Sequence, residues 1–314
     1  MRRFPVFDNH FHLDPKGGRA AAVREFAKAG GTHLMIVHKP YGDPPRFNAT
    51  LDDHRRDMET TLRLADEVRK DVPDVRLWVA LAPHPAEFTK MLEAGHAIAD
   101  AERVYREASE LAQRYVREGR AVAMGEVGRP HWTPVAPDVW DAANRLMEHQ
   151  FVLAKDAGCP VIIHCETGTP EVYADLAGRC DTVGLARDKA VKHFSPPLVA
   201  AANVHGLLPS VLVGKDGWQK AVADGVAGVG RAAPAPAEAA TALAGLGAAE
   251  LRVACRMLWE TDYMDDPRYP GAVLGPKTVP KRAKELLDAG GPEEALWVVH
   301  KEVPERAYGI EIAL

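Results

Sequence analysis

The stretch Asp8-Asn9-His10-Phe11-His12-Leu13-Asp14 follows an apolar run, Phe4-Pro5-Val6-Phe7, near the start of the chain. The apolar run predicts a buried strand, and residues two apart on a strand point to the same side. His10 and His12 therefore share one face at the carboxyl end of this strand. Two imidazoles side by side suit one divalent metal ion. By itself such a pair is more often part of an ordinary half-buried strand, so the rest of the chain decides.

Composition and charge narrow the class of protein. The chain has 314 residues, 46% of them hydrophobic, and a net charge of -5. These values are typical of a soluble globular protein with a sizeable core. Acidic and basic residues are interspersed, which is not the pattern of a basic nucleic-acid-binding surface. A polyanion would have to be bound locally or through a metal.

Cysteine usage and apolar runs bear on location. The four cysteines are scattered and form no CxxC pair, which argues against a disulfide framework and against a thiolate metal site. This usage fits a reducing cytosol, so we expect a cytoplasmic protein. No apolar run of signal-peptide length follows the first arginines. No stretch approaches the ~18 apolar residues that a membrane helix needs.

Strand and helix patterns alternate eight times along the chain, which predicts a parallel sheet with crossover helices. Eight such units in 314 residues favour a single-domain (β/α)8 TIM barrel over residues 1–314. An open sheet with an extra helical lobe is the alternative. Strands are expected at 4–7, 32–37, 75–81, 121–124, 160–163, 188–192, 209–213 and 255–259. Helices are expected at 18–28, 51–70, 86–119, 137–157, 169–177, 198–205, 279–289 and 292–308.

Two segments between the expected strands and helices have an unusual composition. The segment 41–50 is rich in Pro and Asp and predicts a loop. The Ala/Gly/Pro-rich segment 221–249 resembles a flexible linker, but we interpret it as a loop over 225–235 followed by an Ala-rich helix. Its glycines follow no strand and match phosphate-binding loops only weakly.

The expected strands end in residues that bind metals or substrates. In a parallel barrel all these ends lie on one rim, the carboxyl-terminal one. The residues are His10, His12, His38, His84, Glu126, His164, His193, Lys215 and Asp262. Four of these histidines, His10, His12, His164 and His193, form with the two carboxylates a metal site that has enough ligands for two ions. Glu126 is the natural bridging carboxylate, and Asp262 suits the acceptor of a proton from the attacking water.

Each of these assignments has a structural alternative. Glu126 lies between glycines and is compatible with a plain loop carboxylate, His164 with a core histidine and Asp262 with a turn cap. An accidental placement of all of them at strand ends is improbable. His38 and His84 occupy positions suited to substrate binding. The remaining histidines are interpreted as structural or solvent-exposed: His33, His54, His96, His131, His149, His205 and His300.

Taken together, these motifs resemble those of TatD-type metal-dependent hydrolases, within the amidohydrolase-like superfamily of metal-bearing barrels. The matching pieces span nearly the whole chain in the family's order: Asp8-Asn9-His10-Phe11-His12-Leu13-Asp14, Ala82-Pro83-His84-Pro85, Gly125-Glu126-Val127-Gly128, Val161-Ile162-Ile163-His164, His193-Phe194-Ser195 and Glu260-Thr261-Asp262. The resemblance implies a phosphodiester hydrolase, often a deoxyribonuclease, dependent on Mg²⁺, Mn²⁺ or Zn²⁺. It also implies the ligand sets: His10, His12 and Asp262 for one ion, His164 and His193 for the other, and Glu126 bridging.

The chain departs from the family pattern around the substrate. Arg129-Pro130 stands where the family continues with Leu-Asp, and Glu166 stands where an arginine is usual. The sixth-strand motif is shortened to His193-Phe194-Ser195. An acid in place of an arginine removes a phosphate contact and repels a polyanion. The ligand roles therefore carry over better than the DNase activity. Candidates to replace the lost cation are Arg129, Lys39 and Lys215.

Three functions fit these residues. The first is hydrolysis of a phosphoester by metal-activated hydroxide, with DNA or a small molecule as substrate. The second is hydrolysis of an amide, lactone or carboxyl ester; relatives with such activities often bridge their metals with a modified lysine on the fourth strand, where this chain has Glu126. The third is a metal-binding scaffold without turnover. The presence of Asp262 argues against it, because a scaffold does not need a general base. The four histidines favour a borderline metal such as Zn²⁺ for at least one position. The sequence does not predict the oligomeric state.

Overall fold

A barrel of parallel strands forms the centre of the molecule. The computed structural model describes residues 4–41, 47–132 and 135–313. The strands are β1 Phe7–His12, β2 His33–Val37, β3 Arg76–Ala80, β4 Met124–Gly128, β5 Val161–His164, β6 Ala190–Ser195, β7 Leu208–Leu212, β8 Leu258–Glu260 and β9 Tyr263–Met264. They form two sheets, in the orders β3-β2-β1-β9 and β4-β5-β6-β7-β8. Neighbouring strands within each sheet are parallel.

The two sheets meet at two seams. On one side Ala80 at the end of β3 forms a parallel bridge with Ala123, just before β4. On the other side β8 continues after two residues into β9, which pairs with the end of β1 at Phe11 and His12. The eight main strands thus follow one another in chain order around the centre. The expected α/β architecture, a TIM barrel of parallel strands, is confirmed.

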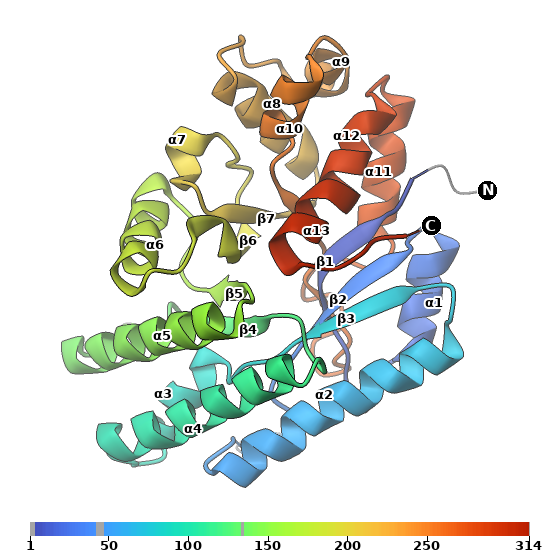
Figure 1. The fold of residues 1–314 in the computed structure, drawn as a ribbon. Helices are drawn as coiled ribbons and strands as arrows, with labels where there is room; N and C mark the ends of the chain where they lie inside the picture. The colour runs from blue at the N-terminus through green and yellow to red at the C-terminus, as the bar shows by residue number, and fades with distance from the viewer. Residues whose placement is uncertain (1–3, 42–46, 133–134, 314) are drawn as a thin grey trace.

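Helices surround the strands (Figure 1). They are α1 Ala20–Lys28, α2 Leu51–Asp71, α3 Pro85–Glu93, α4 Ile98–Arg117, α5 Pro137–Ala157, α6 Pro170–Val183, α7 Ala201–Val204, α8 Gly217–Gly228, α9 Ala239–Ala244, α10 Ala248–Ala254, α11 Thr278–Asp288, α12 Glu293–Trp297 and α13 Val303–Tyr308. Short 3₁₀ turns lie at Arg187–Lys189 and Pro236–Glu238, and a π-helical segment, Val298–Glu302, joins α12 to α13. No helix of the described residues is long and apolar enough to cross a membrane.

Local sequence explains the ends of the long helices. Thr50 caps α2: its hydroxyl accepts a hydrogen bond from N of Asp53, whose carboxylate accepts one from N of Thr50 in return. α5 begins at Pro137 and ends at Gly158, which has φ 68°. Proline at the first position and a left-handed glycine after the last are typical helix boundaries. Every residue of β1, β2 and β4 is buried, as expected for parallel strands covered by helices.

The predicted loop over 225–235 is wrong in its first part. Residues 225–228 belong to α8, and the connection begins only after Gly228. A Cβ at position 225 would lie 2.1 Å from the carbonyl oxygen of Ala254. Gly225 is therefore there to let α8 approach α10 closely, and not to break the helix. The expected Ala-rich helix is split into α9 and α10. For the predicted loop 41–50, residues 42–46 lie outside the described part of the chain.

Five strands, β1, β4, β5, β6 and β8, begin and end later than predicted, and two of these shifts bear on the site. β4 covers Met124–Gly128 and so contains Glu126, and β6 covers Ala190–Ser195 and so contains His193. Both side chains are thus fixed by strand backbone and not by a loop. This placement gives the candidate site a rigid base.

Candidate metal centre

The first donor set lies at the carboxyl end of β1. Nε2 of His10 and Nε2 of His12 are 3.1 Å apart, and Nε2 of His12 is 3.4 Å from Oδ1 of Asp262. Nε2 of His10 is 3.8 Å from the same oxygen. Both imidazoles are buried, and Asp262 is only 9% exposed. Two nitrogens and one carboxylate oxygen thus face a common centre, as in a metal site of imidazole and carboxylate ligands.

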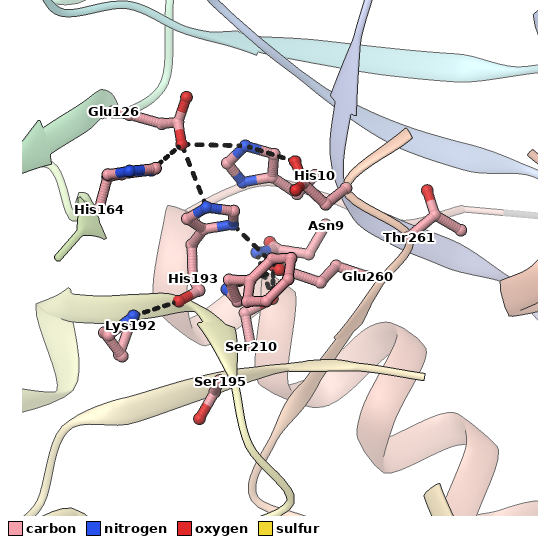
Figure 2. Close-up of polar contacts among 12 residues, drawn as sticks. Asn9, His10, Glu126, His164, Lys192, His193, Ser195, Ser210, Glu260 and Thr261 are labelled. Atoms are coloured by element: carbon pink, nitrogen blue, oxygen red, sulfur yellow. Dashed lines mark hydrogen bonds and ion pairs between the residues drawn. The ribbon is translucent and has the colours of Figure 1, made fainter. Parts of the chain in front are cut away.

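Glu126 lies between this set and a second one. Its Oε1 is 2.8 Å from Nδ1 of His164 and 3.1 Å from Nε2 of His193. The same oxygen is 3.7 Å from Nε2 of His10, and Oε2 is 3.7 Å from Nε2 of His12. Figure 2 shows the carboxylate pointing toward His10, His164 and His193. One carboxylate that reaches both histidine pairs has the geometry of a bridging ligand.

The tautomers of two histidines fit metal binding. Nδ1 of His12 is 2.9 Å from the carbonyl oxygen of Val37, and Nδ1 of His193 is 3.0 Å from Oε1 of Glu260. An oxygen acceptor at Nδ1 requires the proton to be on that nitrogen. Nε2 of each ring faces the centre and is the nitrogen that would bind a metal ion in place of a proton. The donor set and its outer contacts therefore fit divalent ions.

Glu260 lies at the site, although the sequence analysis of strand ends assigned it no role. Its Oε1 also accepts a hydrogen bond from N of Phe194, at 2.7 Å, and its Oε2 accepts one from the hydroxyl of Ser210. Ser210 in turn accepts from Nδ2 of Asn9 at 2.9 Å, and Oδ1 of Asn9 accepts from Tyr308 at 2.6 Å. Figure 2 shows this network beside His193. Its signal in the sequence was the Glu-Thr-Asp motif, of which only the Asp was assigned a role.

His131 is also at the site, contrary to the expectation that it lies elsewhere. It is exposed, but its Nε2 is 2.9 Å from Nε2 of His164. It follows β4 by three residues, and the turn after the strand brings it back over β5. The strand-end criterion could not find a residue placed by a turn.

His84 has the opposite tautomer from His12 and His193. It caps α3: its Nδ1 accepts a hydrogen bond from N of Ala86 at 3.0 Å. The proton of the neutral ring is therefore on Nε2, which is 3.7 Å from Oε2 of Glu126. His84, Glu126 and His164 are close enough to hold an ion, but a protonated Nε2 cannot be a ligand. His84 instead offers a hydrogen-bond donor to the site.

Burial and charge shift the pKa values of these groups in the metal-free protein. Burial raises the pKa of Glu126, but the neighbouring His164 and His84 outweigh it and hold the pKa well below its usual range. Burial lowers the pKa of His193, but the Glu260 and Glu126 carboxylates together outweigh burial and raise it to about 10. Burial, reinforced by the charge of His193, holds the pKa of His10 well below its usual range. Glu126 is thus ionised at neutral pH, as a bridging ligand must be.

A cavity of about 510 Å³ opens beside the donor sets. Its wall combines site residues with basic and aromatic side chains: His12, His84, Glu126, Lys39, Lys90, Arg268, Tyr41, Phe47 and Tyr269 are among them. Lys39, expected to contact substrate, is held by Asp14 at 2.6 Å and Asp266 at 3.1 Å. The charge of Lys39 is therefore largely neutralised.

Two other expected substrate residues, His38 and Lys215, do not line this cavity. His38 is fully buried with Nδ1 2.7 Å from the hydroxyl of Thr61, and it is not among the cavity-lining residues. Lys215 is exposed after β7 and does not line the cavity either.

Arg129 is occupied by partners within the chain. Its guanidinium pairs with Glu166 and with Asp175, the latter at 2.6 Å, and donates to Asn144 at 3.0 Å. The ring of Trp140 lies 4.7 Å from the guanidinium carbon. Arg129 and Glu166, two of the departures from the family pattern, thus neutralise each other.

Comparison with known proteins identifies the family of the chain. Residues 7–309 match the family model described as TatD related DNase. The chain belongs to this family. A curated relative, the uncharacterized protein MJ1127 of Methanocaldococcus jannaschii, is 32% identical over 318 residues, covering 100% of this chain and 99% of that protein. The family assignment makes this TatD-related chain a metal-dependent hydrolase.

Solved structures share the fold of this TatD-related chain. The TatD homolog YjjV of Escherichia coli superposes with a TM-score of 0.60 at 20% identity, covering 97% of this chain and 98% of that one. The phosphotriesterase homology protein of Escherichia coli, complexed with phosphate in its active site, gives a TM-score of 0.57 at 11% identity, with 97% and 98% covered. These likenesses concern the barrel and not the substrate.

Proposed function

We propose that this protein hydrolyses phosphoester bonds with the help of two divalent ions. The observation that carries the proposal is the position of Glu126, whose carboxylate lies within 3.7 Å of His10 on one side and 3.1 Å of His193 on the other. His10, His12 and Asp262 would hold one ion, His164 and His193 the other. Ions of this kind, when bound, lower the pKa of water and polarise the bond under attack.

The chain's own residues supply the remaining steps. Asp262 has the most exposed side chain among the six proposed ligands apart from His164, and its carboxylate would accept the proton of the attacking water. His84 would donate from Nε2 to an oxygen of the substrate. Glu260 would keep the Nδ1 proton of His193 in place, so that this ring presents its lone pair to the site.

The cavity supports a small substrate over long DNA. Its volume of about 510 Å³ is that of a small-molecule site. Of the candidate cations, Arg129 is paired with Glu166 and Lys39 with Asp14, so neither stands ready to track a phosphate backbone. The same cavity would accept a lactone or carboxyl ester, and hydrolysis of such a carbon-centred bond is the second candidate. The four free, buried cysteines support a cytoplasmic location.

Metal analysis of the purified chain, run beside an assay of phosphodiester and lactone panels with and without chelator, tests the proposal. We expect two Zn²⁺ or Mn²⁺ ions per chain and chelator-sensitive cleavage of a small phosphodiester. Cleavage of the lactones alone would favour the second candidate. Bound metal without any cleavage would favour a scaffold. A chain that neither contains nor takes up metal would refute both hydrolase assignments.

A further inference from the structure

Exposed aromatic side chains gather at the mouth of the barrel. Within the described residues the exposed large hydrophobic side chains are Trp132, Phe194, Val253 and Tyr269. Trp132 follows β4, Phe194 is in the last part of β6, and Tyr269 lines the cavity. Three of the four thus lie on the carboxyl-terminal side, where the metal centre is. Large aromatic groups left in water around a site indicate contact with a ligand.

Two of these aromatic side chains lie beside the histidine pair formed by His164 and His193. The ring centroid of Trp132 is 6.0 Å from that of His164, and the ring of Phe194 is 5.8 Å from that of His193. The two imidazoles are 5.5 Å apart and nearly parallel, at 24°. The four rings form a continuous series, with the metal-ligand histidines in the middle and an exposed aromatic at each end. A group bound at these histidines would lie between Trp132 and Phe194.

The structure fixes both aromatic side chains instead of burying them. Phe194 has φ 50°, a conformation that a bulky residue rarely adopts, and its N–H is held by Glu260 at 2.7 Å. In this conformation 47% of Phe194 is exposed. Trp132 stacks against His84, with centroids 6.2 Å apart and an angle of 22°, and is 39% exposed. The ring of Trp132 and the backbone of Phe194 are thus held by residues of the site itself.

We propose that Trp132 and Phe194 form an aromatic subsite beside His164 and His193 that binds a flat ring carried by the substrate. The subsite rests on the proposed hydrolase function and gives it a substrate class: esters with an aryl or heteroaryl group next to the bond that is cleaved. Neither aromatic side chain lines the cavity beside His12 and Lys39. Trp132 stacks on His84, which does line the cavity, so the bound ring would lie next to the cavity that takes the rest of the substrate.

Binding of two non-hydrolysable probes tests the subsite without turnover. Phenylphosphonate and methylphosphonate share the anionic head and differ in the ring. We expect the metal-loaded protein to bind phenylphosphonate ~5- to 100-fold more tightly, because stacking of a flat ring on an aromatic side chain contributes on this scale. Trp132→Ala and Phe194→Ala should each reduce this preference, and the double variant should abolish it, with methylphosphonate binding unchanged. Trp132→Phe and Phe194→Tyr should largely restore it.

The control is Val253→Ala, which removes an equally exposed apolar side chain on α10 and should change neither affinity. Equal affinity of the intact protein for the two phosphonates would overturn the subsite, as would a preference that survives the double variant. Assays of phenyl and methyl phosphodiesters separate this proposal from the hydrolase assignment. Ring preference without cleavage of any ester would refute the hydrolase and keep the subsite, and cleavage without ring preference would do the reverse.

Discussion

Oε1 of Glu260 lies 3.0 Å from Nδ1 of His193, and this contact keeps a proton on Nδ1 of the ring. Glu260 is fully buried and also accepts hydrogen bonds from N of Phe194 and from Ser210. It would thus act on the proposed metal centre through His193 without being a ligand itself.

The first prediction concerns this contact. Glu260→Gln removes the charge that favours Nδ1–H on His193 and disturbs a network in which every group has a partner. We expect affinity for the divalent ion to fall ~10- to 100-fold, as is typical for loss of an outer contact to a metal-ligand histidine. Calorimetric titration of the metal measures it. Glu302→Gln, which alters an exposed ion pair with Arg252, is the control. Unchanged affinity in Glu260→Gln would mean that the contact is only structural.

The second prediction concerns the bridging role of Glu126. Its Oε1 is 2.8 Å from His164 and 3.1 Å from His193, and its Oε2 is 3.7 Å from His12. Glu126→Gln should lower the metal content below two ions per chain, because a neutral amide no longer offsets the repulsion between two cations. Elemental analysis of the dialysed variant gives the number. The control is Glu166→Gln. Glu166 lies in the loop after β5 and pairs with Arg129, so this variant should keep both ions. Two tightly bound ions in Glu126→Gln would exclude a bridge.

The third prediction concerns proton transfer to Asp262. Asp262→Asn retains an oxygen ligand but cannot accept a proton. Metal should still bind, somewhat more weakly, whereas the turnover number should fall ~100- to 10,000-fold, the usual contribution of a general base. Turnover is compared at saturating metal, so that the weaker binding does not contribute. Unchanged turnover would refute the assigned role of Asp262.

The sequence was sufficient to predict the barrel and to bring the candidate ligands to one rim, because both follow from short-range patterns. Alternating apolar strands and amphipathic helices predict the eight units, and parallel strands place their last residues on one rim. His10, His12, Glu126 and His193 follow from that rule alone. They required no knowledge of the tertiary contacts.

Long-range contacts explain what the sequence did not predict. Gly225 looked like a helix breaker, but it is a contact point between α8 and the backbone of Ala254. His131 reaches His164 through the turn after β4. Arg129 was a candidate cation for the substrate, and only the folded chain shows that Glu166 and Asp175 occupy it. Nothing in the local pattern of these residues specifies a partner about 30 or more positions away.

The fourth prediction separates two roles for His84. Because Nδ1 accepts from N of Ala86, Nε2 is a donor and the residue is not a metal ligand. His84→Asn keeps a good helix cap but is too short to reach Glu126. We expect the full metal content, with turnover reduced by up to ~100-fold through loss of one donor to the substrate. His84→Gln, which has a longer amide donor, should recover part of the turnover. Loss of one ion per chain in His84→Asn would show that His84 is a metal ligand.

The fifth prediction concerns stability in acid and rests on His300. This residue is fully buried in the π-helical segment, with Nδ1 3.3 Å from N and 3.2 Å from O of Phe7 at the start of β1. Burial lowers the pKa of His300 to about 3, whereas in the unfolded chain it is about 6.5. The unfolded state therefore binds a proton in this interval that the folded state does not.

It follows that the contribution of His300 to stability is complete above pH ~6.5 and is lost as the pH falls toward 3, by up to ~1.4 kcal/mol for each pH unit. His300→Gln cannot take up that proton. We expect the variant to be less stable at pH 7 but to lose stability less steeply between pH 6 and 4, in urea unfolding of the metal-free protein. His96→Gln, at an exposed position, should leave the slope unchanged. A slope in His300→Gln equal to that of the parent would mean that His300 is already protonated in the folded protein, with its charge compensated within the barrel.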